Sequence, residues 1–249
     1  MKIAISGKGG VGKTTIIAML AEQMRQDGME VLVIDADPSP QMAQTIGVKN
    51  PEKIIPIADM KQTLIERSGK TEGSPFYNIN PQVDDLLSRY MVEENGLKLM
   101  VLGAIETGDK GCACAENTVL RRMLTKMLLG PHQAILLDME AGVEHLGRGT
   151  IAGVDHLLTV VIPQKSSIRT ALKVKKLADD VGIKKVHFIG NHVIDKDDED
   201  FLTEGLGTKP IAFFREYPEV SKTERKGLPV ISQLDLMREP VKDVLEALK

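Results

Sequence analysis

Residues 7–14 constrain this chain more than any other feature. They read Gly-Lys-Gly-Gly-Val-Gly-Lys-Thr, which matches the phosphate-binding loop pattern of a glycine, four residues, a second glycine, a lysine and a serine or threonine. An apolar run over residues 2–6 predicts a strand before the loop, and residues 15–25 predict a helix after it. Glycines let successive backbone N–H groups turn toward a phosphate, and the helix N-terminus adds its partial positive charge. The motif in this context therefore predicts a nucleotide site.

The side chains of the loop have distinct expected roles. Lys13 is expected to reach the β- and γ-phosphates, and Thr14 is expected to ligate Mg²⁺. The nucleotide-binding residues that we predict in and just after the loop are Gly7, Gly9, Gly10, Val11, Gly12, Lys13, Thr14 and Thr15.

Lys8 follows the first glycine of the loop, where an ordinary phosphate-binding loop needs no lysine. A cation there reaches its own nucleotide poorly because the loop curls away. It is better placed to reach a nucleotide on a second copy of the chain, as an arginine finger does in trans. The alternative is that Lys8 is one more solvated surface lysine.

Residues 8–14 resemble the deviant Walker A motif of the MinD/ParA/nitrogenase-iron-protein superfamily. This resemblance implies an ATPase that dimerises around two nucleotides and binds ATP or ADP with Mg²⁺. It also implies that Lys8 and Lys13 act in catalysis.

Composition limits the class of protein. A chain of 249 residues is long enough for one large α/β domain, and no linker, repeat or low-complexity run divides it. The net charge of −3 and the pI near 6.0 predict neither nucleic acid nor a membrane as partner. The chain opens on a charged residue and a strand, so we expect no signal peptide. Only two cysteines are present, which favours a reducing, cytoplasmic setting.

Apolar runs alternate with helical stretches along most of the sequence. Several of the runs are continuously hydrophobic, as buried parallel strands are. We therefore predict a single P-loop NTPase domain over residues 1–249, with a mostly parallel, twisted sheet flanked by helices on both faces. Besides 2–6, the predicted strands are 31–35, 97–103, 134–138, 156–163, 185–191 and 211–214. Besides 15–25, the predicted helices are 118–129, 167–181, 199–206 and a short one at 240–249, with 51–81 as an elaboration of the domain.

Acidic residues end two of the predicted strands. Asp35 and Asp37 follow the second strand in an Asp-Ala-Asp-Pro sequence, and Asp138 ends the Ile-Leu-Leu-Asp run that matches the Walker B pattern. Carboxylates at strand ends facing a phosphate-binding loop position a water or bind Mg²⁺ through water. In the superfamily, Asp37 matches the switch I residue that orients the attacking water, and Asp35 matches the other acidic residue of that motif. Asp37 also has the sequence context of a helix N-cap, and the two roles are compatible.

Two further positions complete the predicted nucleotide site. Gly142 follows Asp138 in a segment that resembles switch II, where a glycine N–H senses the γ-phosphate. The alternative is that Gly142 is an ordinary turn glycine, which would have the same sequence context. Asn191 ends a strand and matches the superfamily residue that contacts adenine through its amide. The chain departs from the family in having His192 next and Ala-Phe-Phe-Arg at 212–215, so the details of base contact differ.

Cys112 and Cys114 are separated by one residue in a predicted loop at 108–116. Two thiolates so close converge on one soft metal ion if the loop is curved, and thiolates suit Zn²⁺, Cu(I), Fe–S centres and Ni²⁺. A closed structural zinc site needs four ligands, which two copies of the chain supply on a two-fold axis. A redox-active dithiol, an Fe–S site shared across the dimer, and chance are the alternatives.

The whole chain resembles the CooC-type nickel-insertion ATPases, which mature nickel-containing carbon monoxide dehydrogenase. The resemblance rests on the loop at 7–15, the Asp-Ala-Asp-Pro sequence, Cys-Ala-Cys followed by Glu116-Asn117, and Asp-Met-Glu-Ala-Gly-Val-Glu-His-Leu-Gly-Arg-Gly-Thr at 138–150. It implies a homodimer that forms with nucleotide or metal, binds Ni²⁺ or Zn²⁺ at Cys112 and Cys114, and serves a nickel enzyme, with acetyl-CoA synthase as an alternative client. His145 is either a further metal ligand or a histidine held near a helix N-terminus.

Other functions share parts of this pattern. A reductase of the nitrogenase iron protein type would carry a [4Fe–4S] cluster across the dimer, but its ligand cysteines lie singly and far apart. A partitioning or positioning ATPase would bind DNA or a membrane, which neither the charge nor the C-terminal segment favours. A P-loop amidotransfer or cobalamin-pathway enzyme would need a nucleophilic cysteine beside a base, which the sequence does not suggest.

Overall fold

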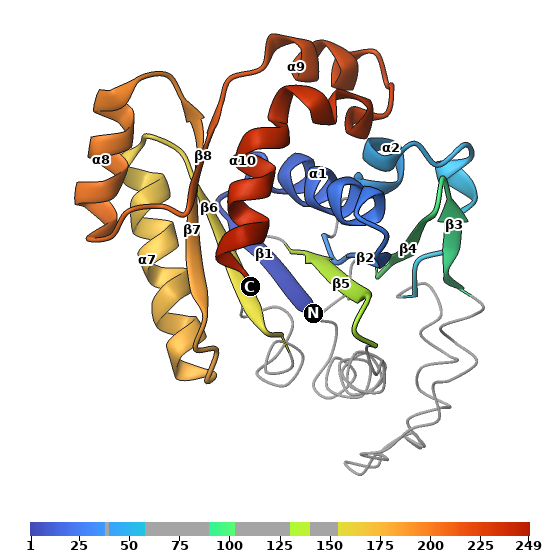
Figure 1. The fold of residues 1–249 in the computed structure, drawn as a ribbon, viewed down its shortest axis with the longest axis horizontal. Helices are drawn as coiled ribbons and strands as arrows, with labels where there is room; N and C mark the ends of the chain where they lie inside the picture. The colour runs from blue at the N-terminus through green and yellow to red at the C-terminus, as the bar shows by residue number, and fades with distance from the viewer. Residues whose placement is uncertain (38–39, 58–89, 103–129, 140–153) are drawn as a thin grey trace, which may run out of the picture.

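The computed structural model describes residues 1–37, 40–57, 90–102, 130–139 and 154–249, in which strands and helices alternate (Figure 1). The strands are β1 (Lys2–Gly7), β2 (Glu30–Asp35), β3 (Val92–Glu94), β4 (Leu97–Val101), β5 (Gln133–Asp138), β6 (His156–Val161), β7 (Val186–Val193) and β8 (Ala212–Arg215). The helices are α1 (Lys13–Gln26), α2 (Met42–Ile46), α7 (Lys165–Asp180), α8 (Lys196–Leu206), α9 (Pro218–Arg225) and α10 (Leu234–Ala247), with short 3₁₀ turns η1 (Pro51–Lys53) and η4 (Val230–Gln233).

The described strands form one eight-stranded sheet in the order β3-β4-β2-β5-β1-β6-β7-β8. Every pairing is parallel except that of β3 with β4. The central strands are buried along nearly their whole length, which explains why they are continuously hydrophobic rather than alternating. The predicted α/β fold with a mostly parallel sheet is confirmed.

Helices cover both faces of the sheet (Figure 1). Alternate side chains of β1, β2 and β5 pack against α1 and α10 on one face, in the larger hydrophobic core. On the other face, α7 packs against the sheet and against α8, with Ile168 of α7 close to the backbone of Gly205. The right-handed crossovers of such a parallel sheet distribute the helices in this way.

Several elements differ from the sequence prediction: α2, α9 and β3 were not predicted, and α10 begins earlier than expected. The predicted strand at 97–103 is confirmed as β4, but β3 and its hairpin with β4 were not predicted, although Asn95 (φ +54°) and Gly96 (φ +77°) form the Asn-Gly turn that is a strong hairpin signal. The last helix begins at Leu234 and not at Pro240, so the predicted boundary was wrong. Proline is a plausible helix start, but here burial of Leu234 and Met237 in the core stabilises the turns before it.

Other predicted elements lie outside the described residues. These are the helix at 118–129 and most of the elaboration at 51–81, of which only η1 and the residues up to 57 are described. In the part of the chain that the structure describes, no helix is both long and apolar enough to cross a membrane.

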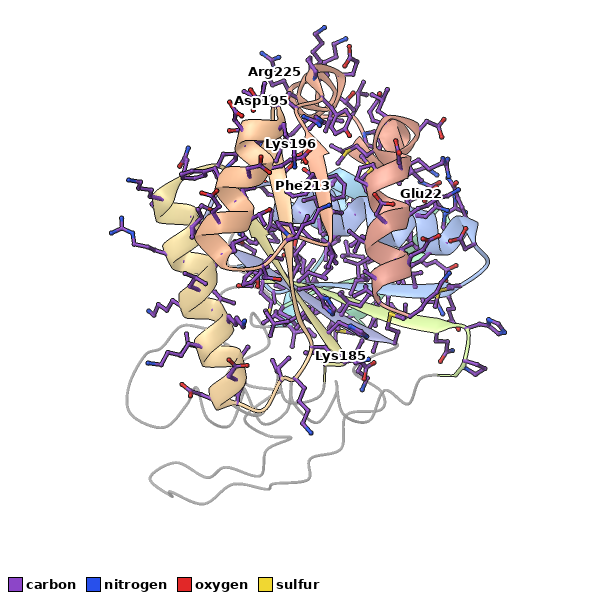
Figure 2. The ribbon with its side chains drawn as sticks, turned by 60° about the vertical axis from the view of Figure 1, so that its left-hand side comes forward. Glu22, Lys185, Asp195, Lys196, Phe213 and Arg225 are labelled. Atoms are coloured by element: carbon purple, nitrogen blue, oxygen red, sulfur yellow. The ribbon has the colours of Figure 1, made fainter. Side chains whose placement is uncertain are left out.

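The two ends of the sheet have different roles. Lys185 precedes β7 and Asp195 follows it, so they mark opposite ends of this strand, and Figure 2 shows Asp195 near the top and Lys185 well below it. Arg225 of α9 lies at the same end as Asp195 in that view. This end carries the carboxyl termini of the parallel strands, where α/β sheets of this kind bind their ligands.

Candidate functional site

The phosphate-binding loop joins β1 to α1 at the carboxyl edge of the sheet. Gly12 is the N-cap of α1 and has a left-handed backbone (φ +89°), as has Gly10 (φ +77°). No side chain caps the N-terminus of α1, so its first N–H groups are left for a ligand. A side chain on Gly7 would place its Cβ 2.6 Å from the carbonyl oxygen of Val160 on β6. The glycines that the motif specifies are therefore required by the geometry.

The two lysines of the loop point in different directions. Lys13 is buried, and its ammonium donates to the carbonyl oxygen of Lys8 at 3.5 Å, across the curve of the loop. The side chain of Lys8 is exposed and donates to the hydroxyl of Ser166 at 3.0 Å, in the first turn of α7. Lys13 lines the cavity described below, whereas Lys8 does not.

Thr14 and Asp138 meet beneath the loop. The Thr14 hydroxyl donates to Oδ2 of Asp138 at 2.6 Å. Asp138 ends β5, next to β1 in the sheet, and is 1% exposed. Its other oxygen, Oδ1, is buried without a hydrogen-bond donor among the described residues.

Burial raises the pKa of Asp138 to about 7, and the negative charges of Asp35 and Asp37 raise it further, against the hydrogen bond from Thr14 and the charge of Lys13. A carboxylate with a spare buried oxygen beside a threonine hydroxyl is a donor set that suits Mg²⁺, a hard cation that prefers oxygen ligands. The residues present therefore fit the metal that the motif implies.

Asp35 organises the segment that follows β2. Its Oδ1 accepts from the N–H of Asp37 at 3.1 Å, and its Oδ2 accepts from the N–H groups of Gln41 and Met42, each at 3.0 Å. Asp35 is fully buried, and this burial raises its pKa, while the three backbone donors act against the shift. It therefore holds the loop and the start of α2, and Asp37 lines the cavity at the end of this loop. The predicted second role of Asp37 as a helix N-cap was wrong, because α2 begins at Met42 with Gln41 as its N-cap.

Asn191 lies against the phosphate-binding loop from the other side. It is 8% exposed, and its Nδ2 donates to the carbonyl oxygen of Val11 at 2.8 Å. Val11 itself is fully buried in the core. The predicted base-contacting residue and the predicted phosphate loop are thus in direct contact.

A cavity of about 500 Å³ opens over these residues. The phosphate loop and the start of α1 form one end, with Asp37 and Gln41 beside them, and Asn191 and His192 lie at the carboxyl end of β7. The wall away from the loop comes from β8, α9 and α10, and consists of Arg215, Tyr217, Val220, Ser221, Glu224 and Met237. A volume of this size is typical of small-molecule sites.

The residues of that far wall were not predicted, apart from the general position of 212–215. Most of them come from segments for which no helix was predicted, namely α9 with its N-cap and the first turn of α10. One signal was available: Tyr217-Pro218 is followed by an amphipathic run, and proline at the first helical position marks a helix start.

Among the predicted loop residues, Gly9, Gly10, Gly12, Lys13, Thr14 and Thr15 line the cavity, whereas Gly7 and Val11 support the loop from below. Gly142, Cys112, Cys114 and His145 lie outside the described residues, and so does the predicted metal-binding loop at 108–116.

Comparison with known proteins agrees with this geometry. Residues 2–230 match the family described as the CobQ/CobB/MinD/ParA nucleotide binding domain. An uncharacterised ATP-binding protein of Methanocaldococcus jannaschii is 41% identical over 235 residues, which cover 92% of this chain and 91% of that protein. The carbon monoxide dehydrogenase accessory protein CooC of Rhodospirillum rubrum is 40% identical over 208 residues, which cover 82% and 79% of the two chains.

Solved structures share the fold. The septum site-determining protein MinD of Pyrococcus horikoshii OT3, complexed with Mg-ADP, superposes with a TM-score of 0.66 at 21% identity, over 92% of this chain and 86% of that one. At this identity the likeness concerns the fold.

Proposed function

Because this chain belongs to the CobQ/CobB/MinD/ParA nucleotide-binding family and is an ATPase of the MinD/ParA type, we propose that it is an ATP-dependent metallochaperone that helps insert nickel into carbon monoxide dehydrogenase. The observation that carries the proposal is the Cys-Ala-Cys sequence at 112–114 in a chain 40% identical to a carbon monoxide dehydrogenase accessory protein. Thiolates bind Ni²⁺ and Zn²⁺, and either metal is the cargo in this scheme.

The described residues have defined tasks in ATP hydrolysis. The loop N–H groups and Lys13 would bind the phosphates, and Thr14 with Asp138 would hold Mg²⁺, which would neutralise charge on the phosphate oxygens. Asp37 orients the attacking water, on a loop that Asp35 keeps in place. Gly142, which lies outside the described residues, is assigned the sensing of the γ-phosphate from its sequence resemblance to switch II alone. Acetyl-CoA synthase is the alternative client enzyme.

A second copy of the chain supplies groups that complete both the ATPase site and the metal site. Lys8 reaches the nucleotide of the partner, where its charge stabilises the transition state. The two cysteines of each copy meet at the two-fold axis and provide the four thiolates that one metal needs. Rearrangement of the dimer during the ATP cycle would then change the metal site and drive loading or release.

Metal stoichiometry measured together with oligomeric state tests this proposal. The apo protein is titrated with Ni²⁺ and Zn²⁺, with and without ATP–Mg²⁺, beside a Cys112→Ser/Cys114→Ser variant. We expect one metal per dimer, lost in the variant while nucleotide binding persists. Lys13→Ala is the matched control, since it should lose nucleotide binding and keep the metal.

The other outcomes decide against the proposal. Nucleotide-dependent dimerisation with no metal affinity, unchanged by the cysteine variant, would leave a non-metal ATP switch. Bound iron with a visible absorption band would instead favour a reductase that carries an Fe–S cluster.

A further inference from the structure

Asn191 makes a buried contact that a base-binding role does not require. Its Nδ2 donates to the carbonyl oxygen of Val11 at 2.8 Å, and the two residues are 180 positions apart in the chain. The carbonyl of Val11 and the N–H of Gly12 belong to one planar peptide unit and point in opposite directions. Holding the carbonyl therefore fixes the direction of an N–H in the phosphate-binding loop.

The backbone of β7 is distorted where this contact is made. Gly190 pairs with Phe213 and Val193 pairs with Arg215, so three steps along β7 match two steps along β8, which is a β-bulge. Within the bulge His192 has a left-handed backbone (φ +53°), which is uncommon for a residue with a side chain. Bulges re-aim side chains next to functional sites, and strained backbone persists where surrounding structure requires it.

Gly12 leaves the space that the amide of Asn191 occupies. A Cβ built on Gly12 would lie 2.4 Å from Nδ2 of Asn191, well inside contact distance. Gly10 is also left-handed, yet a Cβ there would meet nothing within 4 Å. Position 12 therefore requires glycine for two reasons: its backbone is left-handed, and any side chain would collide with Asn191.

We propose that Asn191 is a positioning residue for the phosphate-binding loop, which it holds in the phosphate-binding conformation whether or not a base is bound. The inference rests on the proposed nucleotide site. Its amide nitrogen fixes the Val11–Gly12 peptide, and its oxygen remains an acceptor for a ligand in the cavity. Asn191 would therefore link the two parts of the site: a base that contacts its side chain would also affect the conformation of the phosphate-binding loop.

Binding of inorganic tripolyphosphate, which has no base, separates this role from base contact. Full-length wild type, Asn191→Ala and Asn191→Asp are titrated with ATP and with tripolyphosphate, each with Mg²⁺. We expect both variants to bind tripolyphosphate about tenfold more weakly, because the buried Val11 carbonyl loses its donor. The loss should be larger in Asn191→Asp, which is isosteric but places a carboxylate against that carbonyl.

Asn50→Asp is the matched control, because it makes the same chemical change at an exposed position before η1. A second readout needs no ligand: the backbone amide signal of Gly12 in the NMR spectrum of the free protein should shift in both Asn191 variants and stay unchanged in Asn50→Asp. Gly12→Ala should reproduce the tripolyphosphate loss, whereas Gly28→Ala, with a similar φ of +83° and open space around its Cβ, should not.

Variants that weaken ATP binding but bind tripolyphosphate as wild type does, with an unshifted Gly12 signal, would overturn the inference and leave Asn191 as a base contact. Failure of the wild type itself to bind ATP would count against the proposed function. That outcome can be told apart from failure of the inference, because the Gly12 signal reports on the contact between Asn191 and Val11 without any ligand.

Discussion

The Thr14 hydroxyl lies 2.6 Å from the Asp138 carboxylate, which joins the first turn of α1 to the end of β5. The two residues are 124 positions apart, and the adjacency of β1 and β5 in the sheet brings them together. In the described state the hydroxyl is the donor and the carboxylate has one oxygen to spare. Both groups are therefore placed to exchange their mutual contact for a shared cation.

Binding of Mg²⁺–nucleotide should depend on pH through Asp138. Its pKa is about 7 because burial disfavours the charged form, and in the proposed site the cation would bind the ionised carboxylate. Affinity for Mg²⁺–ADP, measured by calorimetry, should rise about tenfold from pH 6 to pH 8, as the ionised fraction of such a group does. Asp138→Asn should bind more weakly and show a smaller dependence. Protons that the nucleotide itself takes up affect both proteins equally, so parallel pH profiles would contradict the assignment.

The stability of the nucleotide-free protein should change with pH in the opposite sense. In the unfolded chain this carboxyl ionises near 3.8, and in the folded chain its pKa is raised to about 7. The folded state therefore binds more protons between these values, so the contribution of Asp138 to stability falls from about pH 4 to about pH 7 and is constant above. Denaturation at pH 5 and pH 8 should show that Asp138→Asn gains stability relative to wild type at the higher pH. A constant difference would mean that the carboxyl is not perturbed.

Lys8 should be needed for hydrolysis and dispensable for nucleotide binding. Lys8→Ala is expected to lower the ATPase rate by a factor on the order of a thousand, as loss of an arginine finger does, and to change ATP affinity by no more than a few-fold. Ser166→Ala is the matched variant, because it removes only the exposed hydrogen bond that Lys8 makes within its own chain. It should keep the ATPase rate within about threefold, since such bonds contribute little.

Mixed dimers decide whether Lys8 acts in trans. Lys8→Ala and Asp37→Ala subunits are each expected to be inactive. In a mixed dimer, the site on the Lys8→Ala subunit keeps Asp37 and receives Lys8 from its partner. An equal mixture should regain about a quarter of the wild-type rate, because half of the dimers then have one working site. No recovery on mixing would point to a role of Lys8 within its own subunit.

Asp35→Ala should destabilise the protein and disable hydrolysis together. The substitution leaves the N–H groups of Asp37, Gln41 and Met42 without their acceptor, and Met42 is fully buried. Leaving buried donors unsatisfied costs about 1–3 kcal/mol, measured here as the free energy of unfolding in urea. Asp179→Ala, at an exposed position of α7, is the control and should be near neutral. An Asp35→Ala protein of wild-type stability would show that the loop does not depend on this carboxylate.

Gly7→Ala should be costly for a different reason. The added Cβ would meet the backbone carbonyl of Val160 at 2.6 Å, and a β-strand backbone cannot move aside as a flexible side chain can. We expect a loss of about 2 kcal/mol relative to Gly182→Ala, where the Cβ would have nothing within 4 Å. Equal unfolding midpoints for the two variants would contradict the close packing of the loop against β6.

The parts of the site that were predicted correctly are local patterns. The glycine spacing of residues 7–12 predicts the phosphate-binding loop between β1 and α1. A continuous apolar run that ends in an aspartate predicts both β2 and β5. The wall of the cavity away from the phosphate-binding loop could not be predicted in this way. Tyr217, Ser221 and Met237 belong to α9, its N-cap and the first turn of α10, and they line the site because the tertiary fold brings these segments beside the phosphate-binding loop.

By itself the sequence determined the phosphate-binding loop, most of the strands and helices, and the parallel sheet. The loop follows from glycine spacing, and the sheet follows from continuous hydrophobic runs that alternate with helical segments. Only the tertiary structure decided which distant groups meet: Thr14 with Asp138, Lys8 with Ser166, and Asn191 with Val11. The tertiary structure also showed that Asp35 accepts hydrogen bonds from the loop after β2 and thereby holds that loop in place. Strand order and a one-residue bulge in β7 set these contacts, and both arise from packing between segments far apart in sequence.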